Sequence, residues 1–327
     1  MRIPFTQLEK EFKRVLLKLD FPEERAAFCA HIFASNSRDG VYSHGLNRFP
    51  TFVEFVKEGL VNPSAEPERI QQFGVTETWN GHRAPGMYNA SMAMDRAIAL
   101  AKEYGIGCVA LQNTSHWMRG GTYGWQAADA GCVGICFTNA LASMAAWGGI
   151  EPTLGNNPLV IAVPREEGHI VLDMAMSQFS YGKMQEYQLD NKQLPFPGGY
   201  DDEGKLSYDP AVIRKNKRGL PIGFWKGSGL AMILDILLVA LSGGRSTAKI
   251  TADGKEFGVS QCFIAIHRPD LHASLIEEVL KYVKSSTPAD PTKPIAYPGE
   301  NTLKTRIQSE REGVLVNEEM WEKLQNM

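Results

Sequence analysis

The run Ser43-His44-Gly45-Leu46-Asn47-Arg48 places a hydroxyl, an imidazole, an amide and a guanidinium within six positions. An imidazole titrates near neutral pH, and a guanidinium binds a carboxylate through two parallel hydrogen bonds. If the chain turns helical here, His44 and Arg48 lie four residues apart on one face. Such a pair would suit an oxo-acid or hydroxy-acid substrate. The alternative is a polar turn with a surface arginine.

Two further polar positions follow apolar runs that we expect to be strands. His116 lies in the polar loop 113–121, directly after the run 107–113, and Asp173 ends the run Ile170-Val171-Leu172. A rigid strand end often presents functional side chains. Alternatively, His116 is structural and the Asp173 carboxylate is satisfied by backbone N–H groups. His44, His116 and Asp173 could form a two-histidine, one-carboxylate metal set. Because none of them has a partner at ligand spacing, we expect no metal.

A Rossmann-type dinucleotide fingerprint needs a strand, then glycines, then a helix. Gly105-Ile106-Gly107-Cys108-Val109-Ala110 fits the letters, but a predicted helix precedes it and a predicted strand follows it. We therefore interpret Gly105 as a helix stop. Trp225-Lys226 precedes Gly227-Ser228-Gly229 at a predicted helix start, where it would suit a cofactor ring and phosphate. The alternative for this pair is a partly buried tryptophan beside a solvated lysine.

Composition indicates an ordinary globular protein. The 327 residues are 43% hydrophobic and 22% charged, with a net charge of −3. This balance gives no reason to expect nucleic acid or a membrane surface as a partner. The five cysteines form no CxxC pair, and the N-terminus lacks the apolar core of a signal peptide. We therefore expect a reduced, cytoplasmic protein.

The hydrophobic spacing predicts a helical N-terminal part, residues 1–64, followed by a mixture of helices and strands in residues 65–327. Residues 158–163 and 170–173 flank turn residues and predict a β-hairpin, so at least part of the sheet is antiparallel. Residues 190–224 are rich in Gly, Pro and Asp and predict a functional loop or an arm around a neighbour. The fold class is α/β of the α+β type. The predicted strands are 70–79 (broken at Gly74), 107–113, 132–138, 158–163, 170–173 and 259–266; the predicted helices after residue 64 are 87–104, 123–130, 230–241, 273–283 and 318–325.

Several motifs together resemble those of the malate/L-lactate dehydrogenase type 2 family, along essentially the whole chain. Within that family, the similarity is greatest to the bacterial reductases that act on 2,3-diketo-L-gulonate. The motifs are Val41 to Pro50, His116-Trp117-Met118-Arg119-Gly120-Gly121, Asn157-Pro158-Leu159-Val160, Leu172-Asp173-Met174-Ala175, Phe179-Ser180-Tyr181-Gly182, Gln193-Leu194-Pro195, Asp201-Asp202-Glu203-Gly204, Trp225 to Gly229 and Phe263-Ile264-Ala265-Ile266.

This resemblance implies a non-Rossmann fold, with a mixed, largely antiparallel sheet flanked by helices. It also implies a homodimer and a cofactor cleft to which the partner subunit contributes. Residues 1–64 would carry the catalytic histidine motif and residues 65–327 the cofactor-binding and dimerisation part, together one catalytic unit. The cofactor would be NAD, as NADH, with NADP as the alternative.

Carried over by position, His44 matches the family's proton donor, and the resemblance implies a nicotinamide-dependent reductase. Ser43, Arg48, His116 and Asp173 are expected to contact the substrate, a sugar-derived 2-oxo acid with 2,3-diketo-L-gulonate as the best candidate. The expected cofactor-binding residues are His169, Ile170, Val171, Leu172, Asp173, Met174, Ala175, Trp225, Lys226, Gly299, Glu300 and Asn301.

One departure from the family pattern bears on the substrate. Met176 stands where a threonine is common in the broader family, which we interpret as pointing away from malate and lactate. A malate- or lactate-type dehydrogenase of the same family nevertheless remains the alternative. A metal-dependent hydrolase or lyase using His44, His116 and Asp173 is a more distant one.

Overall fold

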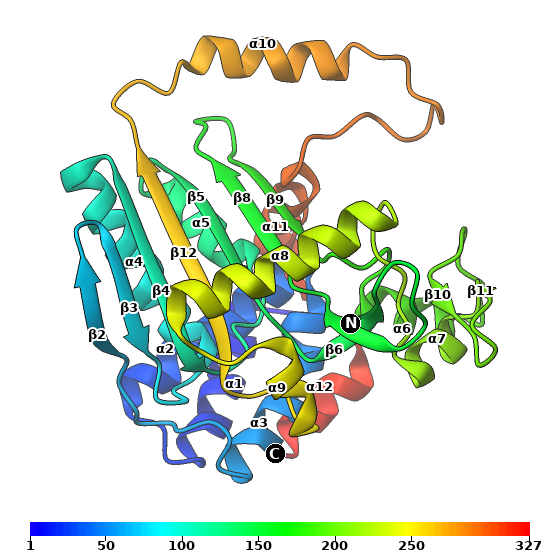
Figure 1. Ribbon diagram of the computed structural model, residues 1–327, viewed down its shortest axis with the longest axis horizontal. Coiled ribbons are helices and arrows are strands. Elements are labelled where there is room, and N and C mark those ends of the chain that lie inside the picture. Colours follow the sequence, from blue (N-terminus) through cyan, green and yellow to red (C-terminus); the bar gives the residue numbers. More distant parts are fainter.

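A seven-stranded mixed sheet forms the centre of the protein (Figure 1). The computed structural model describes residues 1–327. Only the β3–β4 pair is parallel, and the predicted hairpin is confirmed as the antiparallel pair β8–β9. The fold is therefore mixed and largely antiparallel, as expected. In spatial order the strands are β2 (Glu68–Phe73), β3 (Thr76–Asn80), β4 (Ile106–Thr114), β12 (Val259–His267), β5 (Cys132–Thr138), β8 (Leu159–Val163) and β9 (Ile170–Met174).

Helices cover both faces of this sheet. Figure 1 shows α8 (Trp225–Ser242) crossing one face, with α4 (Gly86–Tyr104) and α5 (Gly121–Asp129) on the other. On the α4–α5 side, small buried alanines from the helices pack against Val109, Phe263 and other strand residues. Small side chains let a helix approach the strands closely, so this side forms a dense core.

The glycine pattern at 105–110 is a helix stop, as predicted. Gly105 has φ +88° and ends α4, and β4 begins at the next residue. Glycine adopts this left-handed conformation without the steric cost that a Cβ would bring. The order of elements is therefore helix, glycine, strand, and no Rossmann fingerprint is present at this position.

The N-terminal helices form a separate layer, to which the end of the chain returns. Aromatic rings of Phe12, Phe33, Phe49 and Phe52 pack together at its centre, and Val314, Trp321 and Leu324 complete the same core. β1 pairs with β13. The layer comprises β1 (Arg2–Ile3), α1 (Phe5–Leu17), α2 (Glu23–Arg38), α3 (Phe49–Lys57), α11 (Glu300–Glu312), β13 (Val314–Leu315) and α12 (Glu318–Gln325).

Residues 190–224 contain two short strands and a helix, and the prediction that they contact a neighbouring subunit stays a prediction. With the preceding helix they enclose a small core of Met184, Leu194 and Ile213. The elements here are α6 (Tyr181–Leu189), β10 (Gly199–Tyr200), β11 (Leu206–Ser207) and α7 (Pro210–Asn216). A further hairpin and a short helix lie beneath α8: β6 (Ala142–Ala145), β7 (Pro152–Gly155) and α9 (Thr247–Ala252).

Two helices expose large apolar side chains. The outer face of α8 carries Met232, Ile233, Ile236 and Leu237, while α10 (Ala273–Lys284) buries none of its residues and exposes Leu275, Val279, Tyr282 and Val283. Figure 1 shows α10 standing off from the sheet. By length and composition alone α8 could cross a membrane, but a third of it is buried and its inner face packs on the sheet. Core helices meet the same criterion, so this is weak evidence for a membrane span.

Candidate active site

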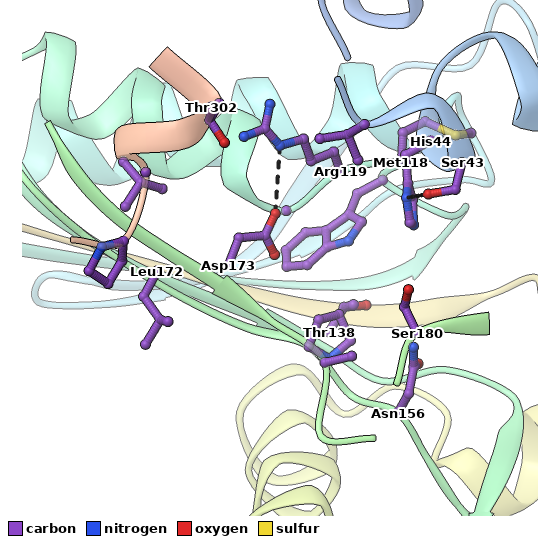
Figure 2. A pocket seen from close by; sticks show the side chains of 18 of the residues that line it. Ser43, His44, Met118, Arg119, Thr138, Asn156, Leu172, Asp173, Ser180 and Thr302 are labelled. Atoms are coloured by element: carbon purple, nitrogen blue, oxygen red, sulfur yellow. Dashed lines mark hydrogen bonds and ion pairs between the residues drawn. The ribbon is translucent and has the colours of Figure 1, made fainter. Parts of the chain in front are cut away.

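A cavity of about 600 Å³ lies between the N-terminal layer and the edge of the sheet. Its volume is in the range of roughly 300–1,000 Å³ that is typical of small-molecule sites. Figure 2 shows Ser43 and His44 at one end, Thr302 and Leu172 at the other, and Arg119 with Asp173 between them. Of the sequence-predicted site residues, the structure brings into this lining Ser43, His44, His116, Val171, Leu172, Asp173, Ala175, Gly299 and Asn301.

The segment carrying His44 consists of two short 3₁₀ turns, η1 (Tyr42–His44) and η2 (Leu46–Arg48). The end of α2 holds both turns. Asn36 Nδ2 donates to the His44 carbonyl at 2.9 Å, and Ser37 Oγ accepts from the Leu46 N–H at 3.0 Å. The side chains of Ser43, His44 and Arg48 therefore project from a segment whose backbone is held in place by α2.

The rings of His44 and His116 stack, with centroids 5.7 Å apart. The Met118 N–H donates to His116 Nδ1 at 2.9 Å, so a neutral His116 carries its proton on Nε2. Ser43 Oγ lies 3.0 Å from His44 Nδ1. Burial, with the charges of Arg48 and Arg119, lowers the pKa of His44 to about 4. Burial, with the nearby Arg48 and His44, also holds the pKa of His116 well below its usual range. Both imidazoles are therefore neutral at pH 7 in the free protein.

Arg48 does not contribute to the main lining. Together with His116 and Met118 it borders a second, much smaller pocket. Its Nη2 is 3.8 Å from Glu256 Oε2. A guanidinium has five N–H donors, so this one contact leaves donors free for a ligand.

The sequence left open whether the Asp173 carboxylate faces a site or is satisfied by backbone N–H groups, and the structure shows both. It lines the cavity, and its Oδ2 also accepts the Gly121 N–H at the start of α5 at 2.8 Å. Burial raises the pKa of Asp173, while Arg119 and the Gly121 N–H oppose the increase. Arg119 Nε lies 3.7 Å from the same carboxylate, and its Nη1 donates to Asp39 at 2.8 Å.

Asp39 links this wall to α11. Arg306 donates to both of its carboxylate oxygens, at 2.9 and 2.7 Å. Although burial alone would raise it, the guanidiniums of Arg306, Arg119 and Arg38 hold the pKa of Asp39 below its usual range. One carboxylate thus connects α2, the His116 loop and α11.

The far end of the cavity is built mainly from backbone. The Pro298 carbonyl accepts the Val171 N–H at 2.9 Å, so the segment before α11 pairs with the edge of β9. Gly299 has φ +94°, and a Cβ there would stand 3.0 Å from Val171 N. Asn301 and Thr302, in the first turn of α11, line the cavity. A helix N-terminus with free N–H groups attracts phosphate, so these residues fit a dinucleotide.

Seven of the predicted residues do not contribute to the main lining: Arg48, His169, Ile170, Met174, Trp225, Lys226 and Glu300. His169 bonds to Asp129 and to the Arg165 N–H, and Glu300 is paired with Lys284 and Lys304, which lower its pKa to about 2. Met174 packs toward α8. Trp225 is 65% exposed at the start of α8. The predicted substrate contact of Arg48 and the predicted cofactor contacts of the other six residues stay predictions.

The interpretation of Met176 needs correction. Its side chain is fully buried in the core beneath α8, with Phe137 and Met144, and does not face the cavity. Its identity therefore has no direct bearing on substrate contacts. His44, His116 and Asp173 line one cavity, but the chain has no group of three metal-ligating side chains arranged to hold an ion.

Sequence reasoning missed several lining residues, namely Thr138, Asn156, Ser180, Glu256, Tyr297 and Thr302. Ser180 stands in a family motif without an assigned role, and Asn156 directly precedes another. The helix α11 was missed altogether. Its start carries a signal that could have been used, because Gly299 is followed at once by an acidic residue, Glu300.

Comparison with known proteins agrees with the cavity chemistry. Residues 3–325 match the model of the malate/L-lactate dehydrogenase family. The chain is 44% identical to a 2,3-diketo-L-gulonate reductase of Escherichia coli strain 536 over 331 aligned positions, covering 99% of each chain.

Solved structures show the same fold. The malate dehydrogenase of Entamoeba histolytica superposes with a TM-score of 0.93 at 27% identity, covering 100% of this chain and 96% of that one. The sulfolactate dehydrogenase of Methanocaldococcus jannaschii gives 0.90 at 30% identity, with the same coverage of 100% and 96%.

Proposed function

Because the chain belongs to the malate/L-lactate dehydrogenase family and is an oxidoreductase, we propose that it reduces the C2 ketone of a sugar-derived 2-oxo acid. The best candidate reaction converts 2,3-diketo-L-gulonate to 3-dehydro-L-gulonate. The supporting observation is the cavity, with two stacked imidazoles at one end and a helix N-terminus at the other, in a chain 44% identical to such a reductase.

A nicotinamide, NADH in our proposal and NADPH as the alternative, supplies the hydride when bound. The first turn of α11 and the backbone of β9 would hold its phosphates and ribose. Asn301 and Thr302 offer unpaired N–H groups there, and Gly299 leaves room against Val171.

His44 gives its proton to the ketone oxygen as the alkoxide develops. The proton has to be acquired first, because burial and two arginines lower the pKa of His44 to about 4 in the free protein. A substrate carboxylate held by Arg48 offsets that positive charge and raises the pKa again. Binding of the oxo acid therefore favours protonation of His44, the general acid of the reaction. General acids typically contribute about 10²–10⁴-fold in rate.

His116 and Ser43 orient the substrate beside His44. The fixed tautomer of His116 offers an Nε2–H as a donor to a substrate oxygen. Arg48 fixes the carboxylate, bidentate where geometry allows, and this decides which face of the ketone meets the hydride. Asp173 borders the reacting groups from the β9 side.

We also propose a cytoplasmic homodimer in which the apolar faces of α8 and α10 meet a second copy. These faces expose several large aliphatic side chains each, more than scattered surface residues account for. All five cysteines are free thiols, which fits a reducing compartment. A sedimentation experiment reporting a monomer at micromolar concentration would contradict the dimer.

The deciding assay follows NADH absorbance with 2,3-diketo-L-gulonate, oxaloacetate and pyruvate side by side, and repeats the best pair with NADPH. We expect the highest kcat/KM with 2,3-diketo-L-gulonate. Preference for oxaloacetate or pyruvate would favour the malate- or lactate-type alternative. Loss of turnover on adding a chelator would favour the metal-dependent alternative instead.

A further inference from the structure

Glu256 is a cavity-lining carboxylate that sequence reasoning did not single out. It comes from the loop between α9 and β12, and its side chain is 22% exposed. Its one charged neighbour is Arg48, whose Nη2 lies 3.8 Å away, beyond hydrogen-bond length. Burial raises the pKa of Glu256, and the charge of Arg48 opposes that increase. The carboxylate thus faces the cavity without a hydrogen-bond donor from the chain.

The other inward-facing carboxylates differ from Glu256 in this respect. Asp39 accepts four short contacts from arginines within the fold, counting Arg38. Glu77 accepts from Arg96, Arg69 and the Trp79 indole. Asp235 accepts from Asn139 and the Thr247 N–H. A carboxylate removed from bulk water needs such donors. Glu256 has no such donor within the chain, so water supplies its donors in the free protein and a bound ligand that displaces this water has to replace them.

Glu256 lies at the end of the cavity where the substrate is reduced. Its neighbour Arg48 is also the charged group that, after burial, most lowers the pKa of His116 and of His44. Glu256 and both imidazoles line the same cavity. The phosphate-binding features lie at the other end, near Thr302 (Figure 2). The missing donors are therefore expected on the oxo acid rather than on the nucleotide.

The charges around the cavity disfavour a second acid group on the substrate. Arg119 is the one lysine or arginine in the lining, and its charge is taken up by Asp39 and Asp173. Neutral polar groups, among them Thr138, Asn156 and Ser180, make up much of the remaining polar wall. Hydroxyl groups on a substrate chain match such a wall, whereas a second carboxylate would meet Glu256.

We propose that Glu256 is the specificity-determining residue of this site: its carboxylate accepts hydrogen bonds from hydroxyls on the chain of a polyhydroxylated 2-oxo acid and repels dicarboxylates. This inference rests on the proposed function. Arg48 then serves two groups at once: it binds the C1 carboxylate of the substrate and opposes the increase in the pKa of Glu256 that burial causes.

The test compares wild type with Glu256→Gln on three substrates at saturating NADH. Glutamine keeps the size of the side chain but removes its charge. For 2,3-diketo-L-gulonate we expect kcat/KM to fall by about ten- to hundredfold, the cost of losing hydrogen bonds to a charged group. For oxaloacetate kcat/KM should rise, because the repulsion is gone. Pyruvate, which has neither hydroxyls nor a second carboxylate, should change little.

Two controls separate specificity from packing. Lys255→Gln changes a charge on the same loop, where the side chain pairs with Glu58 on the surface, and should leave all three kcat/KM values unchanged. Glu256→Asp keeps the charge and should retain the preference for 2,3-diketo-L-gulonate over oxaloacetate. Thermal unfolding of each variant reports whether it folds.

The outcomes distinguish this inference from the proposed function. Equal loss on all three substrates in Glu256→Gln, with an unchanged preference, would assign Glu256 a packing role and overturn the inference alone. Wild-type protein that prefers oxaloacetate to 2,3-diketo-L-gulonate would contradict both proposals.

Discussion

The His44 end of the cavity is lined by side chains with reactive or hydrogen-bonding groups, whereas the α11 end is built mainly from backbone. In the function that we propose, Ser43, His44, His116 and Glu256 each act through a particular functional group. Around Gly299, a peptide carbonyl pairs with β9 and a helix presents its first N–H groups. The side-chain end can be changed one chemical group at a time, while the backbone end responds mainly to changes in chain geometry. Four predictions test this difference.

Removing the imidazole should have the largest effect. We expect His44→Ala to lower kcat by about 10²–10⁴-fold, because the general acid is lost. The Kd for NADH, measured by fluorescence titration, should stay near the wild-type value, since the α11 end is untouched. Weakened NADH binding with kcat preserved would remove His44 from the proton-donor role.

A smaller effect is expected from Arg48→Lys. Lysine keeps the charge but cannot form two parallel hydrogen bonds, so the KM for the oxo acid should rise by roughly ten- to hundredfold. Steady-state kinetics at saturating NADH measure this directly. With KM unaltered, the carboxylate clamp would lie elsewhere, with His116 and Arg119 as the next candidates.

A change in the backbone at the α11 end should weaken NADH binding and leave kcat at saturation unchanged, the opposite of the result expected for His44→Ala. Gly299→Ala introduces a Cβ at φ +94°, 3.0 Å from Val171 N. Strain of about 1–2 kcal/mol would raise the Kd for NADH roughly five- to thirtyfold, with kcat at saturation retained.

Gly74→Ala is the matched control for that variant. Gly74 also has positive φ, at +57°, but lies in the β2–β3 turn, where an added Cβ would have no neighbouring atom within 4 Å. It should lower the melting temperature without changing NADH affinity. A similar change in Kd for both variants would mean that general destabilisation, and not the approach to β9, weakens the cofactor site.

The smallest expected effect is the uptake of a proton by His44 when a substrate analogue binds. The pKa of His44 is lowered to about 4, by burial first and then by Arg48 and Arg119, so the free enzyme binds no proton there at pH 7. An added carboxylate raises a neighbouring pKa by roughly 1–3 units, so binding a non-reducible 2-oxo acid analogue should take up a fraction of a proton between about pH 5 and 7.

A pH-indicator dye measures this uptake, and His44→Gln should abolish it.

The lowered pKa of His44 also predicts how the free energy of unfolding changes with pH. The unfolded chain, with an ordinary histidine pKa, binds the proton more readily than the folded protein. The His44 contribution to stability is therefore complete above about pH 6.5 and is lost as pH falls toward about 4. Proton release on analogue binding would contradict the charging of His44 by the substrate.

The same difference explains what could be predicted from the sequence. Ser43, His44 and His116 could be recognised because the residue type alone identifies the hydroxyl or imidazole group. The hairpin β8–β9 and the stop at Gly105 followed from local turn chemistry. Helix α11 was missed because it buries only Ser309 and so lacks an apolar stripe. Glu256 and Met176 depended on which way a side chain points, and local pattern does not decide that.

The bond between Asp39 and Arg306 also has a consequence for the order in which the molecule is assembled. The two residues are separated by 267 positions, and the strand pair β1–β13 joins residues still further apart, such as Arg2 and Leu315. Contacts between such distant segments form late, since the loop-closure entropy must be met first. During synthesis Arg306 is added 267 positions after Asp39. The segment that carries His44 follows α2, and α2 gains its contact with α11 only after that helix has been synthesised, so we expect the nascent chain to be inactive until then.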